Sequence, residues 1–383
     1  MLIKSNYTRG HLATKGVLAL LLMRPLLTLL LCCSAWSAAE PKVETGDLNG
    51  AKFRIDIPTN WNGGLVMYCH GYSTEPTSYK AEGTLGERLM PFLDAGYAVA
   101  QSGYSAHGWA VQEAIDDTQA LRRYFIAKYG KPKETFITGH SMGGFTTMAL
   151  IEKYPNDYDA ALPLCGALAP ATWYKLRTTF DGRVLFDYYF PGILPSPVNV
   201  PKGFERSKEL EAKVLAVLES RPDQAGALRH YTLVHTNQEL ASNLVFWTYQ
   251  LLDIQQRSGG NPFDNRNTIY TNLPDSNAVN DGVARYASDR RAAEYQRTFY
   301  VPTGKLTRPM LAVHTTYDPL VPTWIPSMYG VLAQDAGSAD LFVLQYVEHD
   351  GHCQILPAEI DKAFHQLKRW KDGGERPESG LLR

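Results

Sequence analysis

The chain has 383 residues, of which 44% are hydrophobic and 20% are charged, a composition typical of a folded globular protein and not of a disordered or fibrous one. Its 38 Lys and Arg residues nearly balance its 39 Asp and Glu residues, and the formal net charge is −1. A chain so close to neutrality offers no electrostatic case for a nucleic-acid partner or an anionic membrane surface.

The first 39 residues look like a secretory signal. They carry several basic residues and no acidic ones, followed by an apolar run over residues 26–33. The small side chains of residues 37–39, Ser-Ala-Ala, then suit cleavage before Glu40. We therefore predict a signal peptide at residues 1–39 and a periplasmic or secreted protein.

The apolar part of this segment is interrupted. Arg24 and Pro25 divide it, so neither piece reaches the roughly 18 residues of a membrane-spanning helix. We expect no membrane span after signal cleavage, and an uncleaved anchor is the alternative. Met1 and Met23 are the two alternatives for the first residue of the natural protein.

Apolar runs and amphipathic stretches alternate from residue 51 to residue 166. The run at residues 51–58 alternates apolar and polar side chains, as in a half-exposed strand, whereas residues 65–69 are apolar throughout, as in a strand buried on both faces. This pattern predicts an α/β protein with a mostly parallel, twisted sheet and helices on both faces. The expected strands cover residues 51–58, 65–69, 97–100, 135–138 and 158–164, and the expected helices cover residues 86–93 and 111–129 and a segment beginning near residue 145.

The pattern changes after Gly166. Residues 167–306 combine helical stretches with loops rich in Gly, Asn and Pro, and they show no strand alternation and no internal repeat. Strand patterns resume at residues 310–314 and 341–347. We predict one α/β domain over residues 40–383, with a mainly helical cap inserted at about residues 167–306. Further helices are expected at residues 324–334 and 357–370, and a frayed tail at residues 372–383.

The pentapeptide Gly139-His140-Ser141-Met142-Gly143 joins an expected strand to the helix that follows it. In this context of strand, sharp turn and helix, a Gly-x-Ser-x-Gly sequence holds its serine in a strained conformation, and the glycines let neighbouring backbone approach. The helix start adds free N–H groups beside the hydroxyl. We predict that Ser141 is a nucleophile; the alternative is a turn that only closes a βα unit.

A serine nucleophile needs a base that takes its proton and a carboxylate that orients this base. The expected chain order is serine, acid, histidine, each at the C-terminal end of its own strand. Asp318 follows the strand at residues 310–314, and His349 and His352 follow the last strand. We predict Asp318 as the acid, with a helix-capping role as the alternative. We favour His352 as the base, because Gly351 allows a tight loop that turns the imidazole back towards the serine.

The cluster of His349, Asp350 and His352 could also be a metal site. Nothing else in the chain has a metal-ligand spacing such as His-Glu-x-x-His, so we predict no metal and no cofactor. Three other histidines lie near the expected site by position and are interpreted as structural; they are His70, His140 and His314.

The oxyanion that forms when a serine attacks a carbonyl needs preorganised donors. The residue after the nucleophile is Met142, and its backbone N–H is expected to be one donor. The other is expected to be the N–H of Tyr72, which follows the glycine-containing loop after the strand at residues 65–69.

Four short sequences together resemble the α/β-hydrolase superfamily, over about residues 51–371 outside the cap. They are Gly139 to Gly144, His70-Gly71-Tyr72, Asp318 to Pro322 and Gly351-His352-Cys353. Residues 103–109 and the Gly-His-Cys ending are similar to exported bacterial carboxylesterase-like members. The His-Cys pair also resembles the tannase and feruloyl esterase group, in which a disulfide ties the histidine loop to a cysteine beside the nucleophile. This chain departs from that group because His140, and not a cysteine, precedes Ser141.

The resemblance implies serine hydrolase chemistry, and it leaves the substrate open. The expected function is an exported serine esterase that acts on a small-molecule ester through an acyl-enzyme, with Ser141, His352 and Asp318 as its triad. A serine peptidase or amidase with the same triad is the main alternative. A non-catalytic binding protein on this fold is a third. The acyl group, the alcohol group and the oligomeric state stay open.

Two of the five cysteines fall in the predicted signal peptide. Cys165 ends the strand after the nucleophile helix and Cys353 adjoins the expected base, so both should lie at the same rim of the sheet. Because export permits oxidation, we predict a disulfide between Cys165 and Cys353. Cys69 lies within an apolar run and is expected to be a buried free thiol. Three unpaired cysteines are the alternative.

Overall fold

The computed structural model describes residues 41–383. The predicted signal peptide at residues 1–39 therefore lies outside the described residues. Among the helices of the described part, none is both long and apolar enough to cross a membrane.

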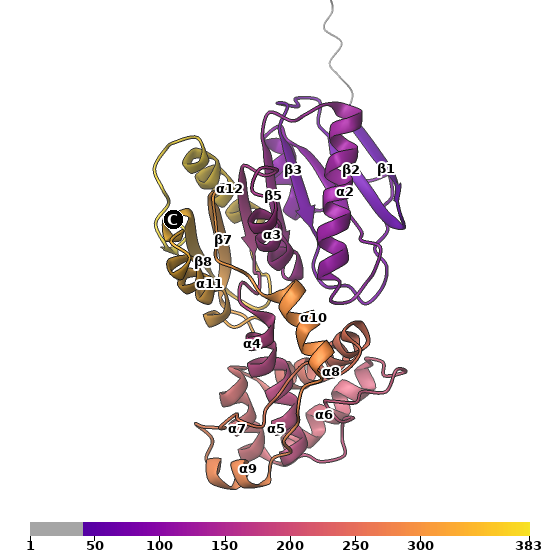
Figure 1. Ribbon diagram of the computed structural model, residues 1–383, viewed down its shortest axis with the longest axis vertical. Helices are drawn as coiled ribbons and strands as arrows, with labels where there is room; N and C mark the ends of the chain where they lie inside the picture. Colours follow the sequence, from indigo (N-terminus) through magenta and orange to yellow (C-terminus); the bar gives the residue numbers. More distant parts are fainter. Residues whose placement is uncertain (1–40) are drawn as a thin grey trace, which may run out of the picture. The chain divides into compact units, whose positions relative to one another are not determined.

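One mostly parallel sheet organises the described chain, as the sequence predicts (Figure 1). Its strand order is β1-β2-β4-β3-β5-β6-β7-β8-β9. The first two strands form an antiparallel hairpin, and β2 joins the edge of β4 in the antiparallel direction as well. The pairings from β4 to β9 are all parallel. The strands are β1 (Lys42–Leu48), β2 (Ala51–Ile57), β3 (Leu65–Cys69), β4 (Ala98–Ser102), β5 (Thr135–His140), β6 (Ala160–Leu164), β7 (Met310–Tyr317), β8 (Phe342–Asp350) and β9 (Gly380–Leu381).

Helices cover both faces of this sheet. They are the short η1 (Glu87–Leu89) and α1 (Met90–Asp94), then α2 (Val111–Tyr129), α3 (Met142–Lys153), α11 (Trp324–Asp335), η3 (Ala339–Leu341) and α12 (Pro357–Lys371). In β3, Met67 packs in one hydrophobic cluster with Phe125 of α2 and Phe145 of α3. Its neighbour Val66 packs in a second cluster with Phe364 of α12. Successive strand residues point to opposite faces, so an apolar run fills both layers.

The predicted frayed tail is wrong in one part. Residues 380–381 form β9, which pairs with β8 in parallel. The N–H of Leu382 donates to the carbonyl of Tyr346 at 2.9 Å, and the side-chain Nε2 of Gln345 donates to the carbonyl of Glu378 at 2.9 Å. The edge of β8 thus supplies one backbone partner and one side-chain partner, which a sequence pattern of two residues cannot reveal.

The segment between β6 and β7 is helical and contains no strand of the sheet (Figure 1). Its elements are α4 (Ala171–Lys175), the π-helical turn η2 (Leu176–Phe180), α5 (Asp181–Tyr189), α6 (Lys208–Ser220), α7 (Pro222–Thr232), α8 (Asn237–Ser258), α9 (Ser276–Gly282) and α10 (Arg290–Tyr300). The long helix α8 begins at a capping box in which Thr236 and Glu239 satisfy each other's backbone N–H groups. We refer to these helices and their loops as the cap.

The cap encloses a salt bridge of its own. Arg183 is fully buried and donates to Asp187 and to the carbonyl of Pro195, each within 2.8 Å. It also donates to the hydroxyl of Thr248 in α8 at 2.7 Å. A buried guanidinium that is paired and hydrogen-bonded in this way links α5 to α8.

The start of α3 lies close against the end of β3. A Cβ atom added to Gly143 would lie 2.0 Å from the carbonyl oxygen of Cys69, and one added to Gly139 would lie 2.5 Å from the same oxygen. No side chain fits between these backbones, so the glycines set how near the helix comes to the sheet. The N-terminus of α3 is thereby fixed at the carboxyl edge of the central strands.

We predict that Gly143→Ala destabilises the protein by about 3 kcal/mol or more, because the new methyl group meets immobile backbone. Urea unfolding followed by circular dichroism measures this loss. The control is Gly203→Ala, where nothing lies within 4 Å of the added atom, and which should change stability by less than about 0.5 kcal/mol. Equal stability of the two variants would contradict the close approach.

Candidate active site

Ser141 occupies the turn between β5 and α3. Its φ of 58° and ψ of −119° lie in a region that costs energy for any residue with a side chain and that glycine adopts readily. Every residue of the preceding strand β5 is buried. The first nine residues of the following helix α3 are also buried, with the exception of Ala149. Rigid packing on both sides holds the turn, and the serine hydroxyl projects from it.

His352 connects Ser141 to Asp318. Its Nε2 atom lies 2.8 Å from the hydroxyl oxygen of Ser141, and its Nδ1 atom lies 2.7 Å from Oδ2 of Asp318. The three residues follow β5, β8 and β7, whose carboxyl ends meet at one edge of the sheet. The structure therefore brings together the three residues that the sequence analysis selected.

The environment of Asp318 decides which imidazole nitrogen carries the proton. Asp318 is only 2% exposed, and its Oδ1 accepts the backbone N–H groups of Leu320 and Val321, each at 2.9 Å. Burial alone would raise the pKa of Asp318, but the hydrogen bond from His352 and nearby positive charge outweigh burial, and the net effect lowers the pKa. The ionised carboxylate accepts a hydrogen bond from Nδ1–H of His352, which leaves Nε2 free to accept the proton of Ser141.

His349 lies elsewhere. The strand β8 continues to Asp350, so His349 is part of the strand, and its Nε2 lies 3.0 Å from Oε1 of Glu359 in α12. Gly351, with a φ of 112°, then turns the chain, and His352 after this turn lies against Ser141. Among residues 41–383, no group of three or more His, Cys, Asp or Glu side chains is arranged to hold a metal ion.

The three other histidines near the site lie behind it. His140 is buried, and burial lowers its pKa to about 3, so its imidazole is neutral. His314 donates its Nε2–H to the carbonyl of Val321, 2.8 Å away, and supports the loop that holds Asp318. The ring of His70 stacks on Tyr104 at 3.9 Å between centroids.

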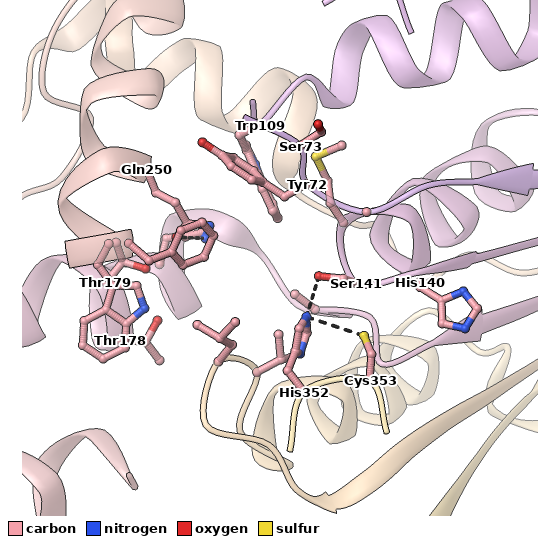
Figure 2. Close-up of a pocket in the computed structure, with 18 of the residues that line it drawn as sticks. Tyr72, Ser73, Trp109, His140, Ser141, Thr178, Thr179, Gln250, His352 and Cys353 are labelled. Atoms are coloured by element: carbon pink, nitrogen blue, oxygen red, sulfur yellow. Dashed lines mark hydrogen bonds between the residues drawn. The ribbon is translucent and has the colours of Figure 1, made fainter. Parts of the chain in front are cut away.

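A disulfide joins Cys165 and Cys353, with 5.2 Å between their Cα atoms. Cys165 immediately follows β6, and its N–H donates to the carbonyl of Val313 in β7. Cys353 adjoins His352, and its Sγ lies 3.5 Å from Nε2 of His352 (Figure 2). The link ties the histidine loop to the centre of the sheet. Cys69 is a buried free thiol, and burial raises its pKa to about 12.

The two backbone groups expected to hold an oxyanion border the same space as Ser141. Met142 is the first residue of α3, where N–H groups have no acceptor within the helix. Tyr72 follows Gly71, at which an added Cβ would lie 3.2 Å from the carbonyl of His140 and 3.4 Å from Cβ of Ser141. The loop thus passes directly beside the serine. The donor roles of Met142 and Tyr72 remain a prediction.

A cavity of about 630 Å³ opens over Ser141 and His352. Its floor comes from the sheet domain, and its opposite wall comes from the cap, where Gln250, Thr178 and Thr179 face the serine and histidine (Figure 2). Trp109 and Tyr72 border it between the two. The wall also contains Tyr174 and Lys175 of α4 and Arg206. The sequence analysis missed Lys175 and Arg206 because no motif marks them.

Comparisons with known proteins match part of this chain. The family model of serine aminopeptidases, S33, matches residues 64–213, which include β3, the Ser141 turn and the first cap helices. The o-phthalyl amidase of Xanthobacter agilis is 28% identical over 125 residues, which are 32% of this chain. The chain spans only 26% of that enzyme's length.

Solved structures of similar fold were also found. Est1E of Butyrivibrio proteoclasticus, solved with ferulic acid bound, is 15% identical, with a TM-score of 0.46 over 86% of this chain and 99% of that chain. Acylaminoacyl peptidase of Pyrococcus horikoshii is 11% identical, with a TM-score of 0.45 over 89% of this chain and 43% of that chain.

We predict that His352→Ala reduces covalent labelling of Ser141 by a fluorophosphonate at least about 100-fold, because Ser141 then has no base. His349→Ala is the matched control and should change the labelling rate less than about threefold, since His349 contacts Glu359 and not the serine. Mass spectrometry of the labelled peptide gives both rates. A larger loss in His349→Ala would reassign the base.

We predict that Cys165→Ala combined with Cys353→Ala lowers the free energy of unfolding by up to about 5 kcal/mol, because the disulfide closes a loop of 188 residues. Labelling of Ser141 should also slow, since the histidine loop loses its anchor. Cys69→Ala, the control, removes a buried thiol without breaking a link and should cost about 1 kcal/mol. Unreduced protein that yields alkylated Cys165 and Cys353 peptides would rule out the link.

Proposed function

We propose that this chain, which has an α/β-hydrolase type of fold, is an exported serine hydrolase that cleaves small carboxylic esters through an acyl-enzyme. One observation carries this proposal: the unbroken chain of hydrogen bonds from Ser141 through His352 to Asp318, which faces a cavity large enough for a small molecule. The signal-like segment at residues 1–39 is the basis for export.

The proposed reaction follows from the positions of these atoms. The oxygen of Ser141 attacks the ester carbonyl while Nε2 of His352 takes the hydroxyl proton. The N–H groups of Met142 and Tyr72 hold the oxyanion. The C–O bond to the alcohol then breaks, and His352 gives its proton to the departing alcohol. Water repeats the attack on the acyl-enzyme with His352 again as the base, which releases the acid and restores Ser141.

The charge of the cavity argues against recognition of a free amino terminus. An aminopeptidase would need a carboxylate near the serine to bind the substrate's ammonium group. None of the described residues that line the cavity is Asp or Glu, while Arg88, Lys175 and Arg206 all border it. We therefore place an aminopeptidase below an esterase.

An amidase with the same triad is the second candidate. The partial match to o-phthalyl amidase favours it, since that enzyme's name describes cleavage of an amide. A non-catalytic binding protein is disfavoured, because it would have no use for a base held between a buried carboxylate and a strained serine.

We predict that the protein hydrolyses 4-nitrophenyl esters and that Ser141→Ala lowers kcat/KM by about 10⁴ or more without changing the melting temperature. Asp318→Asn should cost about 10⁴, because the amide stabilises the wrong tautomer of His352. The 4-nitroanilide of the same acyl group should react much more slowly than the ester. Comparable rates for ester and anilide would favour the amidase, and Ser141→Ala activity within tenfold of the unmodified enzyme would reject the mechanism.

A further inference from the structure

Lys175 is a buried lysine in the wall of the cavity. It is the last residue of α4, immediately before the π-helical turn η2, and it is 5% exposed. Its Nζ atom donates to Oε1 of Gln250 at 2.9 Å and lies 4.3 Å from the centre of the Trp109 ring. Both contacts are with neutral groups. No carboxylate lies within ion-pair distance of Lys175 in the described part of the chain.

No nearby carboxylate of the described chain is free to neutralise the ammonium group of Lys175. The carboxylate with the strongest influence on Lys175 is Asp253, which is already paired with Arg257 at 3.0 Å and accepts the backbone N–H of Trp109. Burial lowers the pKa of Lys175 to about 7, and the charge of Asp253 only partly opposes burial. Arg183, the other deeply buried cation described in this cap, has a carboxylate partner of its own.

Two hydroxyl groups of residues that line the same cavity are also unsatisfied. The phenolic oxygens of Tyr72 and Tyr174 are buried, and neither has a hydrogen-bond partner among residues 41–383. Both tyrosines line the cavity that contains Lys175 and Ser141. Buried polar groups in native proteins are nearly always paired, so unpaired donors that border one cavity indicate a ligand with matching acceptors.

We infer that the cap wall of this cavity binds a carboxylate carried by the substrate, with Lys175 as the ion-pair partner and the Tyr72 and Tyr174 hydroxyls as further donors. A carboxylate supplies the negative charge and the acceptor oxygens that these groups lack. The substrate class is then an ester that bears a second, free carboxylate, such as the half-ester of a dicarboxylic acid. This inference rests on the proposed function and narrows its substrate.

The positions of these groups fit a substrate that bridges the cavity. Gln250, the hydrogen-bond acceptor of Lys175, lies across the cavity from Ser141 and His352 (Figure 2). Trp109 and Phe246 also line the cavity. A substrate would therefore place its ester at the serine, an apolar middle against the aromatic rings, and its carboxylate at the cap wall. Arg88 and Arg206, which are exposed, would add attraction at the entrance.

The test compares matched substrates that differ only in the terminal group. Mono-4-nitrophenyl adipate, suberate and sebacate carry a free carboxylate, and 4-nitrophenyl hexanoate, octanoate and decanoate are their neutral counterparts. We expect kcat/KM to favour the charged member of at least one pair by tenfold or more. A second pair of substrates carries the difference on the alcohol group of the ester. In this pair 4-carboxyphenyl octanoate is charged and 4-carbamoylphenyl octanoate is its neutral counterpart.

Lys175→Met should remove this preference. We expect a loss of about 30-fold or more in kcat/KM for the charged ester, mainly through KM, and a change of less than about threefold for the neutral ester. The melting temperature should stay the same or rise, because an unpaired charge leaves the interior. Lys175→Gln, which keeps a polar partner for Gln250, provides a second variant if the first does not fold. Lys202→Met, an exposed cap lysine, is the matched control and should behave as the unmodified enzyme.

The outcomes separate the two proposals. Equal losses on charged and neutral esters would make Lys175 a structural residue and overturn the inference. Turnover of neutral esters with no preference for any charged one would overturn it as well, and would leave the hydrolase intact. If no ester reacts and a fluorophosphonate does not label Ser141, the proposed function fails. Calorimetric titration with adipate, suberate and sebacate then tests the carboxylate site directly: binding that is lost in Lys175→Met supports it, and no binding rejects it.

Discussion

The close approach of two backbone segments determines where the chemistry of this protein takes place. Because Gly143 has no side chain, the start of α3 reaches the carbonyl end of β3, and the turn before it is compressed into a positive-φ conformation at Ser141. The same approach brings the first N–H of α3 and the loop at Tyr72 to the two sides of the serine. Position, orientation and local polarity of the hydroxyl thus have one steric origin.

Asp318 and His352 are each held beside Ser141 by a different restraint. Asp318 is held in place by two backbone N–H groups. It is kept ionised mainly by its hydrogen bond from His352, whose tautomer it fixes in turn. His352 itself lies in a loop whose freedom is limited by the bond from Cys353 to Cys165. Cys165 and Cys353 both have positive φ values, so three residues with side chains adopt this costly conformation around one site. The surrounding sheet packing supports them.

The cap adds a polar wall to a site whose reactive groups come from the sheet domain. Its interior contains one cation that is fully paired, Arg183, and one that is not, Lys175. A buried charge without a carboxylate partner costs stability. On the proposal above, the carboxylate of the substrate supplies this partner to Lys175. On this interpretation the sheet domain sets the reaction, and the cap sets which molecules enter it.

The sequence alone determined the class of fold and the three residues at its reactive edge. Its signals are local: an apolar run marks a strand buried on both faces, Gly-x-Ser-x-Gly marks a sharp turn, and Gly351 marks the loop that carries His352. The tertiary structure decided what depends on contacts between distant segments. It paired residues 380–381 with β8, placed His349 against Glu359, and joined Cys165 to Cys353.

Lys175 is the clearest case of what only the folded chain reveals. In the sequence it is an ordinary lysine in a helical stretch, and no motif separates it from exposed lysines such as Lys202. Its burial beside Gln250 and Trp109 arises from the packing of α4 against α8 and the sheet domain. Residue spacing within one segment predicts which face of a helix is apolar, but the side chains that surround a buried charge come from other segments, and only tertiary packing brings them together.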